Sequence, residues 1–146
     1  MELYETKGLK KSPLEKTKEE LLEGFRQYLD SQDSLCEDNI AMMKLMPKLL
    51  QLQNDKGRVY GRSYAKHGDV SIFLNVERKF DRISTIMDRA MKEGVDTLYE
   101  GQSATPTETF MDTVVDLGLY GLMWAGYIAD KHPEVYNQFL TLNKLQ

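Results

Sequence analysis

Phe110–Ala129, with the sequence FMDTVVDLGLYGLMWAGYIA, is the stretch that decides the fold of this chain. Most of its side chains are apolar, and a soluble helix that is apolar on nearly every side is typical of a core helix. Asp112 and Asp116 interrupt it four residues apart, so a helix places them on one face. Ionised carboxylates are costly to bury unless a partner or a metal compensates for them. The stretch therefore predicts a buried helix whose two acids need a metal, a basic partner or a shared proton.

The same two aspartates argue against a membrane span, because each central Asp costs about 2.5–3.5 kcal/mol on insertion scales. The chain has 146 residues and a formal net charge of -4, which predicts a single domain, 1–146, with no extended nucleic-acid partner. Residues 1–11 lack the apolar core of a signal peptide and are expected to be flexible. With Cys36 as the only cysteine, the sequence favours a cytoplasmic protein.

Helix-start signals divide the chain clearly. Ser12, Ser34 and Thr105 each precede a glutamate by three residues, the pattern of a capping box, Asp69 can cap a further helix, and Pro133 marks the last start. Pro47 should kink or split the second helix, and Gly57 should lie just beyond its end. No strand pattern is present. The prediction is an all-α helical bundle of four main helices plus a short C-terminal helix, over residues 13–29, 35–54, 70–92, 106–130 and 133–142.

The segment 56–69, KGRVYGRSYAKHGD, is predicted to be a loop because it is rich in glycine, tyrosine and basic residues. Lys56, Arg62 and their basic neighbours would neutralise phosphate, and Tyr60 or Tyr64 would stack on a base. The alternative is a solvated connection between helices. Both interpretations remain open from the sequence.

Acidic residues follow the two predicted helices that flank residues 93–105. Glu77 and Asp81 are four residues apart on one helix, and Glu108, Asp112 and Asp116 continue at the same spacing on the next. If these helices are antiparallel neighbours, the two rows can face each other. Mg²⁺ and Mn²⁺ prefer oxygen ligands of this kind. Glu77, Asp81, Asp112 and Asp116 are therefore the predicted metal ligands.

Each acid also has a simpler explanation. Glu108 completes a capping box, and Asp81 lies beside basic residues with which it can form an ion pair on a solvated face. Asp112 and Asp116 have no Lys or Arg three or four residues away, so local pairing cannot neutralise them.

A series of short motifs resembles the nucleotide modification associated domain type 1 family. It comprises Tyr60-Gly61, Lys79-x-x-Arg82 and the run D-T-x-x-D-L-x-x-Y at 112–120, within about half of the chain. The resemblance implies a relationship to the all-α nucleoside triphosphate pyrophosphohydrolases of the MazG and dimeric dUTPase type, which hold Mg²⁺ with acidic residues on two helices. Their acids are spaced i,i+3, whereas the pairs here are spaced i,i+4.

These observations lead to the hypothesis of a Mg²⁺- or Mn²⁺-dependent nucleotide pyrophosphohydrolase that forms a dimer or tetramer. Catalysis would involve Glu77, Glu108 and Asp112, and substrate would be held by Tyr60, Arg62, Lys79, Arg82 and Tyr120. Two rivals stand beside it: a non-catalytic nucleotide- or signal-binding module, and a phage-type regulator or inhibitor that binds another protein.

Overall fold

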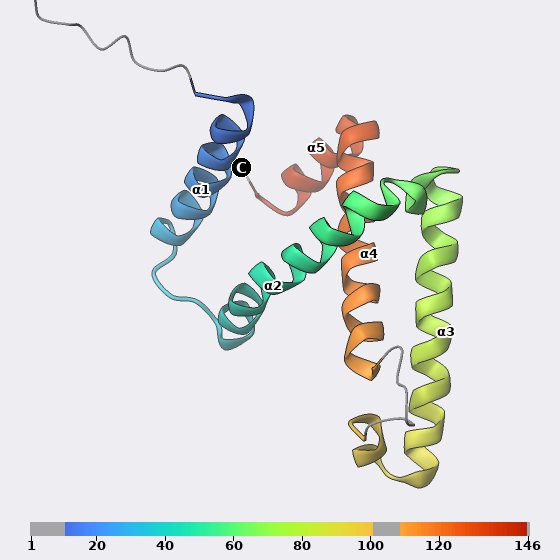
Figure 1. Cartoon of the computed structure of the whole chain (residues 1–146). Helices are drawn as coiled ribbons and strands as arrows, with labels where there is room; N and C mark the ends of the chain where they lie inside the picture. The colour runs from blue at the N-terminus through green and yellow to red at the C-terminus, as the bar shows by residue number, and fades with distance from the viewer. Residues whose placement is uncertain (1–10, 101–108, 146) are drawn as a thin grey trace, which may run out of the picture. The chain divides into compact units, whose positions relative to one another are not determined.

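The computed structural model describes residues 11–100 and 109–145, and these are helical with short connections and no strand (Figure 1). The prediction of an all-α helical bundle with four main helices and a short fifth is confirmed. The α-helices are α1 (Pro13–Asp30), α2 (Glu37–Tyr60), α3 (Asp69–Glu93), α4 (Phe110–Lys131) and α5 (Pro133–Leu142), and the short 3-10 helices are η1 (Ser63–Ala65) and η2 (Val95–Leu98).

The chain divides into two compact units, Met1–Leu45 and Met46–Gln146. The boundary falls inside α2, just before Pro47, whose missing amide hydrogen removes one helical hydrogen bond. The helix nevertheless continues through Pro47, so the predicted split does not occur. In the first unit, α1 begins with the predicted capping box: the Ser12 hydroxyl accepts from the Glu15 amide, and the Glu15 carboxylate accepts from the Ser12 amide.

The second unit is organised by α3 and α4, which lie side by side and antiparallel (Figure 1). Ile72 and Ala90 of α3, Leu98 of η2 and Leu119 of α4 are buried between these elements. The indole Nε1 of Trp124 donates a hydrogen bond of 2.7 Å to Asp69 Oδ1, which joins the end of α4 to the start of α3. Ion pairs of Asp116 with Lys56 and Lys79 link α4 to the C-terminal part of α2 and to α3.

Several predicted boundaries need correction. Helix α2 starts at Glu37 and runs on to Tyr60, so Gly57 is helical and Gly61, with φ +58°, ends the helix instead. Glycine adopts this conformation without the steric strain that a side chain would bring. Asp69 is the first residue of α3 and not its cap, and Gly68 precedes it. Helix α4 starts at Phe110 rather than at 106, whereas the predicted capping box at Thr105 lies outside the described residues.

Helix α4 is less buried than its composition predicts. Thr113 and Leu119 are its buried residues, while Met111, Val114 and Leu122 are about half exposed. One face of this helix therefore presents apolar side chains to solvent. In the described part of the chain, no helix combines the length and apolarity that a membrane span needs.

Candidate functional site

A cavity of about 360 Å³ opens in the second unit between α2, the segment that follows it, α3 and α4. This volume falls within the range of small-molecule sites, roughly 300–1,000 Å³. The described residues that line it are Gln53, Lys56, Gly57, Tyr60, Gly61, Ser63, Tyr64, Arg78, Lys79, Asp116, Leu119, Tyr120 and Met123. Most of them are polar or aromatic, which distinguishes this cavity from a packing defect in an apolar core.

Helical periodicity explains how these side chains meet. On α2, Gln53, Lys56 and Tyr60 follow one another at steps of three and four residues, so they lie on one face. On α4, Asp116, Tyr120 and Met123 repeat this spacing. The cavity is therefore built from matching faces of two helices. Lys79 and its neighbour on α3 complete its wall.

The turn after α2 closes one end of the cavity. Gly61 donates its amide to the carbonyl of Gly57 at 2.9 Å and adopts a positive φ, which redirects the chain into η1. Ser63 and Tyr64 of this segment thereby reach the cavity wall.

At the centre of the site, Asp116 bridges two lysines from different helices. Its Oδ1 accepts from Lys56 Nζ of α2 at 2.9 Å, and its Oδ2 contacts Lys79 Nζ of α3 at 2.8 Å. The side chains of Asp116 and Lys79 are only 15% and 13% exposed, whereas that of Lys56 is 42% exposed. The distant basic partner that was one alternative for Asp116 is therefore present, and it consists of two lysines.

The two lysines also set the protonation state of Asp116. Burial by itself raises the pKa of this carboxyl group, but the hydrogen bonds from Lys79 and Lys56 outweigh burial and hold the pKa below its ordinary value. Asp116 is consequently an anion at neutral pH, and it neutralises one of the two ammonium groups beside it.

Asp112 has a different role, although it lies one turn away. It is the third residue of α4, and its Oδ2 accepts from the Thr109 amide at 2.7 Å and from the Thr109 hydroxyl at 2.6 Å. These hydrogen bonds from Thr109 lower the pKa of Asp112. Asp112 is exposed, so its local task is to cap the helix.

The four predicted metal ligands are not gathered into one cluster. Glu77 and Asp81 are exposed on α3 and do not line the cavity, Asp112 caps α4, and Asp116 binds two lysines. Within residues 11–100 and 109–145, no three His, Cys, Asp or Glu side chains come close enough together to hold a metal ion. Glu108, a predicted catalytic residue, lies outside the described residues.

Some of the predicted substrate-binding residues line the cavity and others do not. Tyr60, Lys79 and Tyr120 line the cavity, whereas Arg62 precedes η1 and Arg82 lies further along α3, and neither is part of the cavity wall.

The structure adds cavity residues that the predicted set lacked. Lys56 was a phosphate-binding candidate in the predicted loop, whereas Gln53 was missed; because α2 extends to Tyr60, helical spacing places both on the face of Tyr60. Tyr64, a base-stacking candidate of the same segment, also lines the cavity, as does Arg78, which no spacing signal in the sequence selects over neighbouring basic residues.

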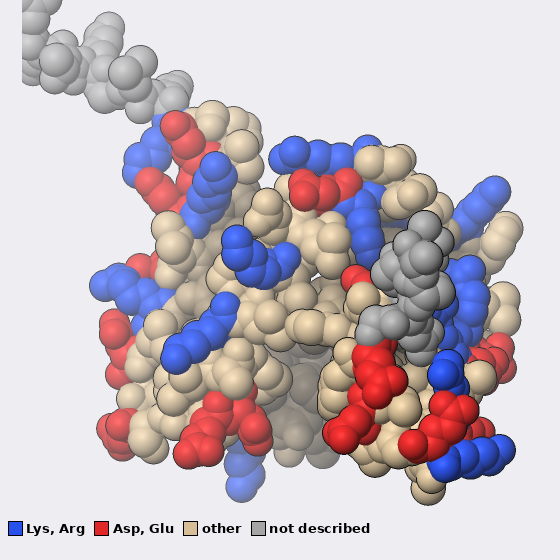
Figure 2. Space-filling view, turned by 60° about the horizontal axis from the view of Figure 1, so that its bottom comes forward, with Lys and Arg blue, Asp and Glu red and all other residues tan. Residues whose placement is uncertain are grey.

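Basic side chains outnumber acidic ones among the described residues that line the cavity, although the chain is acidic overall. Three of these lining side chains are cationic, Lys56, Arg78 and Lys79, and Asp116 is the single acid among them. Elsewhere acidic and basic side chains are both spread over the face that Figure 2 shows. The arrangement favours a small anion bound in the cavity over a large polyanion bound across the surface.

Comparison with known proteins finds similarity to a phage protein. The Gene 30 protein of Bacillus phage SP01 is 28% identical over 136 residues, which is 84% of this chain and 59% of the relative. The chain thus spans less than two thirds of that protein's length. No family model matches the sequence. No solved structure matches it either. The chain is therefore similar to a phage protein.

Proposed function

We propose that this protein binds a nucleotide in the cavity between α2, α3 and α4. The observation that carries the proposal is the convergence of Lys56 and Lys79 on one point of a cavity that three tyrosines also line. Cations beside aromatic rings provide the two contacts that a nucleotide needs, one for its phosphate and one for its base.

The phosphate would lie at the lysine end of the cavity. The Nζ atoms of Lys56 and Lys79 each contact one oxygen of the Asp116 carboxylate, so the two ammonium groups converge on one anionic group. Arg78 is exposed at the same wall and adds a planar guanidinium group. Such charge-assisted hydrogen bonds are about twice as strong as neutral ones.

The base would lie against the tyrosines. Tyr64 and Tyr120 are half-buried, whereas Tyr60 is 69% exposed and is free to close over a ligand. Stacking a base on an aromatic ring contributes roughly 1–3 kcal/mol. The amide of Gln53 offers both a donor and an acceptor for the edge of a base. The resemblance to nucleotide pyrophosphohydrolases supports the same ligand class.

Hydrolysis assisted by Mg²⁺ is a separate prediction. The carboxylates that it requires are present in the sequence, but in the described residues they do not form a donor set that fits a metal ion. Asp116 already uses both oxygens on lysines, and Asp112 uses one on Thr109. We therefore derive no metal-dependent step, and we assign the cavity a binding role.

Isothermal titration calorimetry with a panel of ribo- and deoxyribonucleotides tests the proposal. Lys79→Met should weaken binding at least tenfold, about 1.4 kcal/mol, because it removes one charge-assisted contact. Lys92→Met is the matched control, since Lys92 is exposed near the end of α3 and does not line the cavity. It should bind as the wild type does.

Two results would contradict the proposal. Absence of binding for every nucleotide would refute nucleotide binding and favour a regulator that binds another protein. Equal losses in Lys79→Met and Lys92→Met would show that binding depends on general surface charge and not on the cavity. Measuring pyrophosphate release in the same samples, with Mg²⁺ and with Mn²⁺, tests hydrolysis independently.

A further inference from the structure

We propose that the base of the nucleotide lies flat against the backbone of α2 at Gly57, and that the absence of a side chain there admits a planar ring. The inference rests on the proposed function and adds where the base lies and which residue makes room for it. It follows from the helical conformation of Gly57, from the open space in front of it and from its place in the cavity wall.

Gly57 is a glycine that neither backbone conformation nor packing requires. It lies in the last turn of α2, where glycine is less favourable than alanine, and its φ is not positive, unlike that of Gly61. Apart from its chain neighbours and the backbone of its own helix, no described heavy atom lies within 4 Å of the Cβ that a larger residue would carry here. Its presence therefore needs another explanation.

The open space beside Gly57 belongs to the cavity and not to bulk solvent, because Gly57 lines the cavity and is half-buried. The other glycines within the described α-helices also have open space at the Cβ position, but all of them are exposed and none lines this cavity: Gly24, Gly118, Gly121 and Gly126. Among these glycines, Gly57 is the one whose missing side chain enlarges the cavity.

The face of α2 that borders the cavity separates Gly57 from the lysine assigned to the phosphate. Successive residues of an α-helix are turned by about 100°, so Lys56 and Gly57 lie at opposite edges of this face. Gln53 and Tyr60 lie between these edges, each about one helical turn from Gly57. The phosphate at the Lys56 edge consequently leaves the Gly57 edge to the base.

The surface that Gly57 presents suits the face of an aromatic ring. Its carbonyl already accepts from the Gly61 amide at 2.9 Å, so the contact that it offers to a ligand is chiefly its small, apolar Cα. A flat ring can rest there at the ordinary contact distance of about 3.5–4.0 Å, whereas a Cβ bonded about 1.5 Å farther out would occupy the same space. A phosphate gains little from this contact, because it requires hydrogen-bond donors.

Substitutions of increasing size at Gly57 test this placement by calorimetry, with the nucleotide of the panel that the wild type binds most tightly. Gly57→Ala should weaken binding about fivefold and Gly57→Leu at least about twentyfold, because each side chain fills space that the base needs. Gly118→Ala is the matched control, since this helical glycine also has open space in front of it but does not line the cavity. It should bind as the wild type does.

Thermal unfolding separates this role from a structural one. Alanine forms helix better than glycine, so Gly57→Ala and Gly118→Ala should each raise the melting temperature by about 2–4 °C. Gly57→Ala should thus be more stable than the wild type and bind more weakly. A lower melting temperature for Gly57→Ala would show that the fold requires this glycine, and it would overturn the inference.

Combination with Lys79→Met tests whether the base and the phosphate occupy different ends of the cavity. The losses of affinity from Gly57→Ala and Lys79→Met should multiply in the double variant, because they affect separate contacts. A smaller combined loss, or unchanged binding in Gly57→Ala, overturns the position of the base and leaves nucleotide binding intact. If the wild type binds no nucleotide, both the inference and the proposed function fail.

Discussion

Replacing Asp116 with asparagine should destabilise the second unit, because it leaves two lysines without their shared carboxylate. Lys79 is the costly one: its side chain is 13% exposed, whereas Lys56 is 42% exposed and can turn toward solvent. Removing one partner of a fully buried ion pair costs about 3–5 kcal/mol, and an exposed pair is worth about 0–1 kcal/mol. For this half-buried network we expect a loss of about 2 kcal/mol in the free energy of unfolding.

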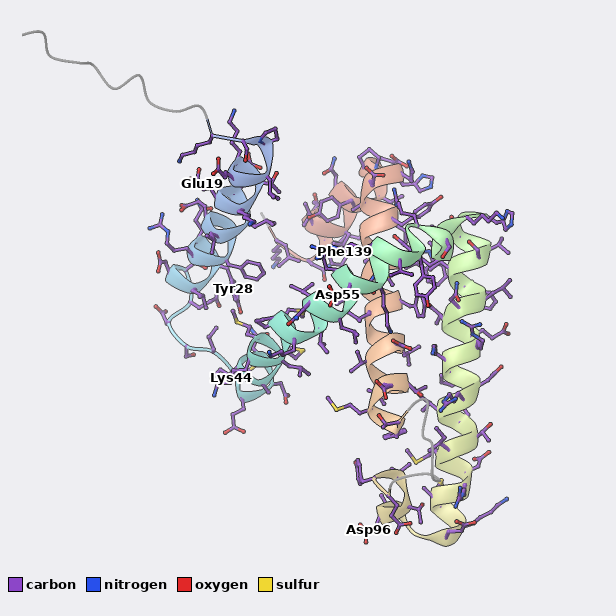
Figure 3. The ribbon with its side chains drawn as sticks, in the orientation of Figure 1. Glu19, Tyr28, Lys44, Asp55, Asp96 and Phe139 are labelled. Carbon is purple, nitrogen blue, oxygen red and sulfur yellow. The ribbon has the colours of Figure 1, made fainter. Side chains whose placement is uncertain are left out.

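Urea unfolding followed by Trp124 fluorescence measures this loss. Trp124 lies on α4 in the same unit as Asp116 and donates to Asp69, so its emission reports the packing of α4 against α3. Asp55→Asn is the matched control, because Asp55, labelled in Figure 3, is exposed on α2, next to Lys56 in the sequence, and does not line the cavity. It should change the free energy of unfolding by less than about 0.5 kcal/mol.

A double-mutant cycle tests whether the loss of stability comes from the ion pairs of Asp116. If the cost arises from an uncompensated ammonium group, adding Lys79→Met to Asp116→Asn should recover part of the loss, with a coupling energy of about 1 kcal/mol or more. Strictly additive losses, or an Asp116→Asn variant as stable as the wild type, would show that the Lys56–Asp116–Lys79 network does not stabilise the unit.

Three further predictions concern pH, backbone and assembly. The pKa of Asp116 is lower in the folded protein than in the unfolded chain, where it is about 3.9, so the stabilisation by its ionised form is present above pH 4 and is lost as the pH falls further. The difference in free energy of unfolding between the wild type and Asp116→Asn should therefore shrink in urea titrations below pH 4. A difference that stays constant with pH would contradict this prediction. Gly61→Ala should cost about 1 kcal/mol in thermal unfolding followed by circular dichroism, because φ is +58° there, and an unchanged melting temperature would refute the argument. The exposed apolar face of α4, with Met111, Val114 and Leu122, predicts a dimer or tetramer by light scattering that Leu122→Glu disrupts, whereas a wild-type mass of 16.9 kDa would exclude self-association.

The helices were predictable from local signals, and their ends only in part. Ser12 with its capping box, Gly94 after α3 and Pro133 at the start of α5 act on adjacent backbone groups, so the sequence determines them directly. Gly57 illustrates the limit. Glycine ends many helices, but a helix that gains tertiary contacts beyond it can continue, and α2 runs on to Gly61.

The residues of the site were predictable only in part from the sequence, and their pairings were not. The expectation that Asp116 needs a compensating cation followed from the cost of burying a carboxylate, and the structure supplies Lys56 and Lys79. Both lysines are distant in sequence from Asp116, so no local spacing rule connects them to it. Asp112 appeared to be equivalent to Asp116 because it shares the same helical face, but its position in the first turn of α4 made it a capping residue.

A crystal structure of the protein with a bound nucleotide and Mn²⁺ tests the central claim most directly. We predict phosphate density within hydrogen-bonding distance of Lys56 Nζ and Lys79 Nζ, the base against Tyr64 or Tyr120, and no anomalous manganese signal at Asp116. A manganese peak coordinated by Asp116, or a nucleotide bound away from this cavity, would contradict the account.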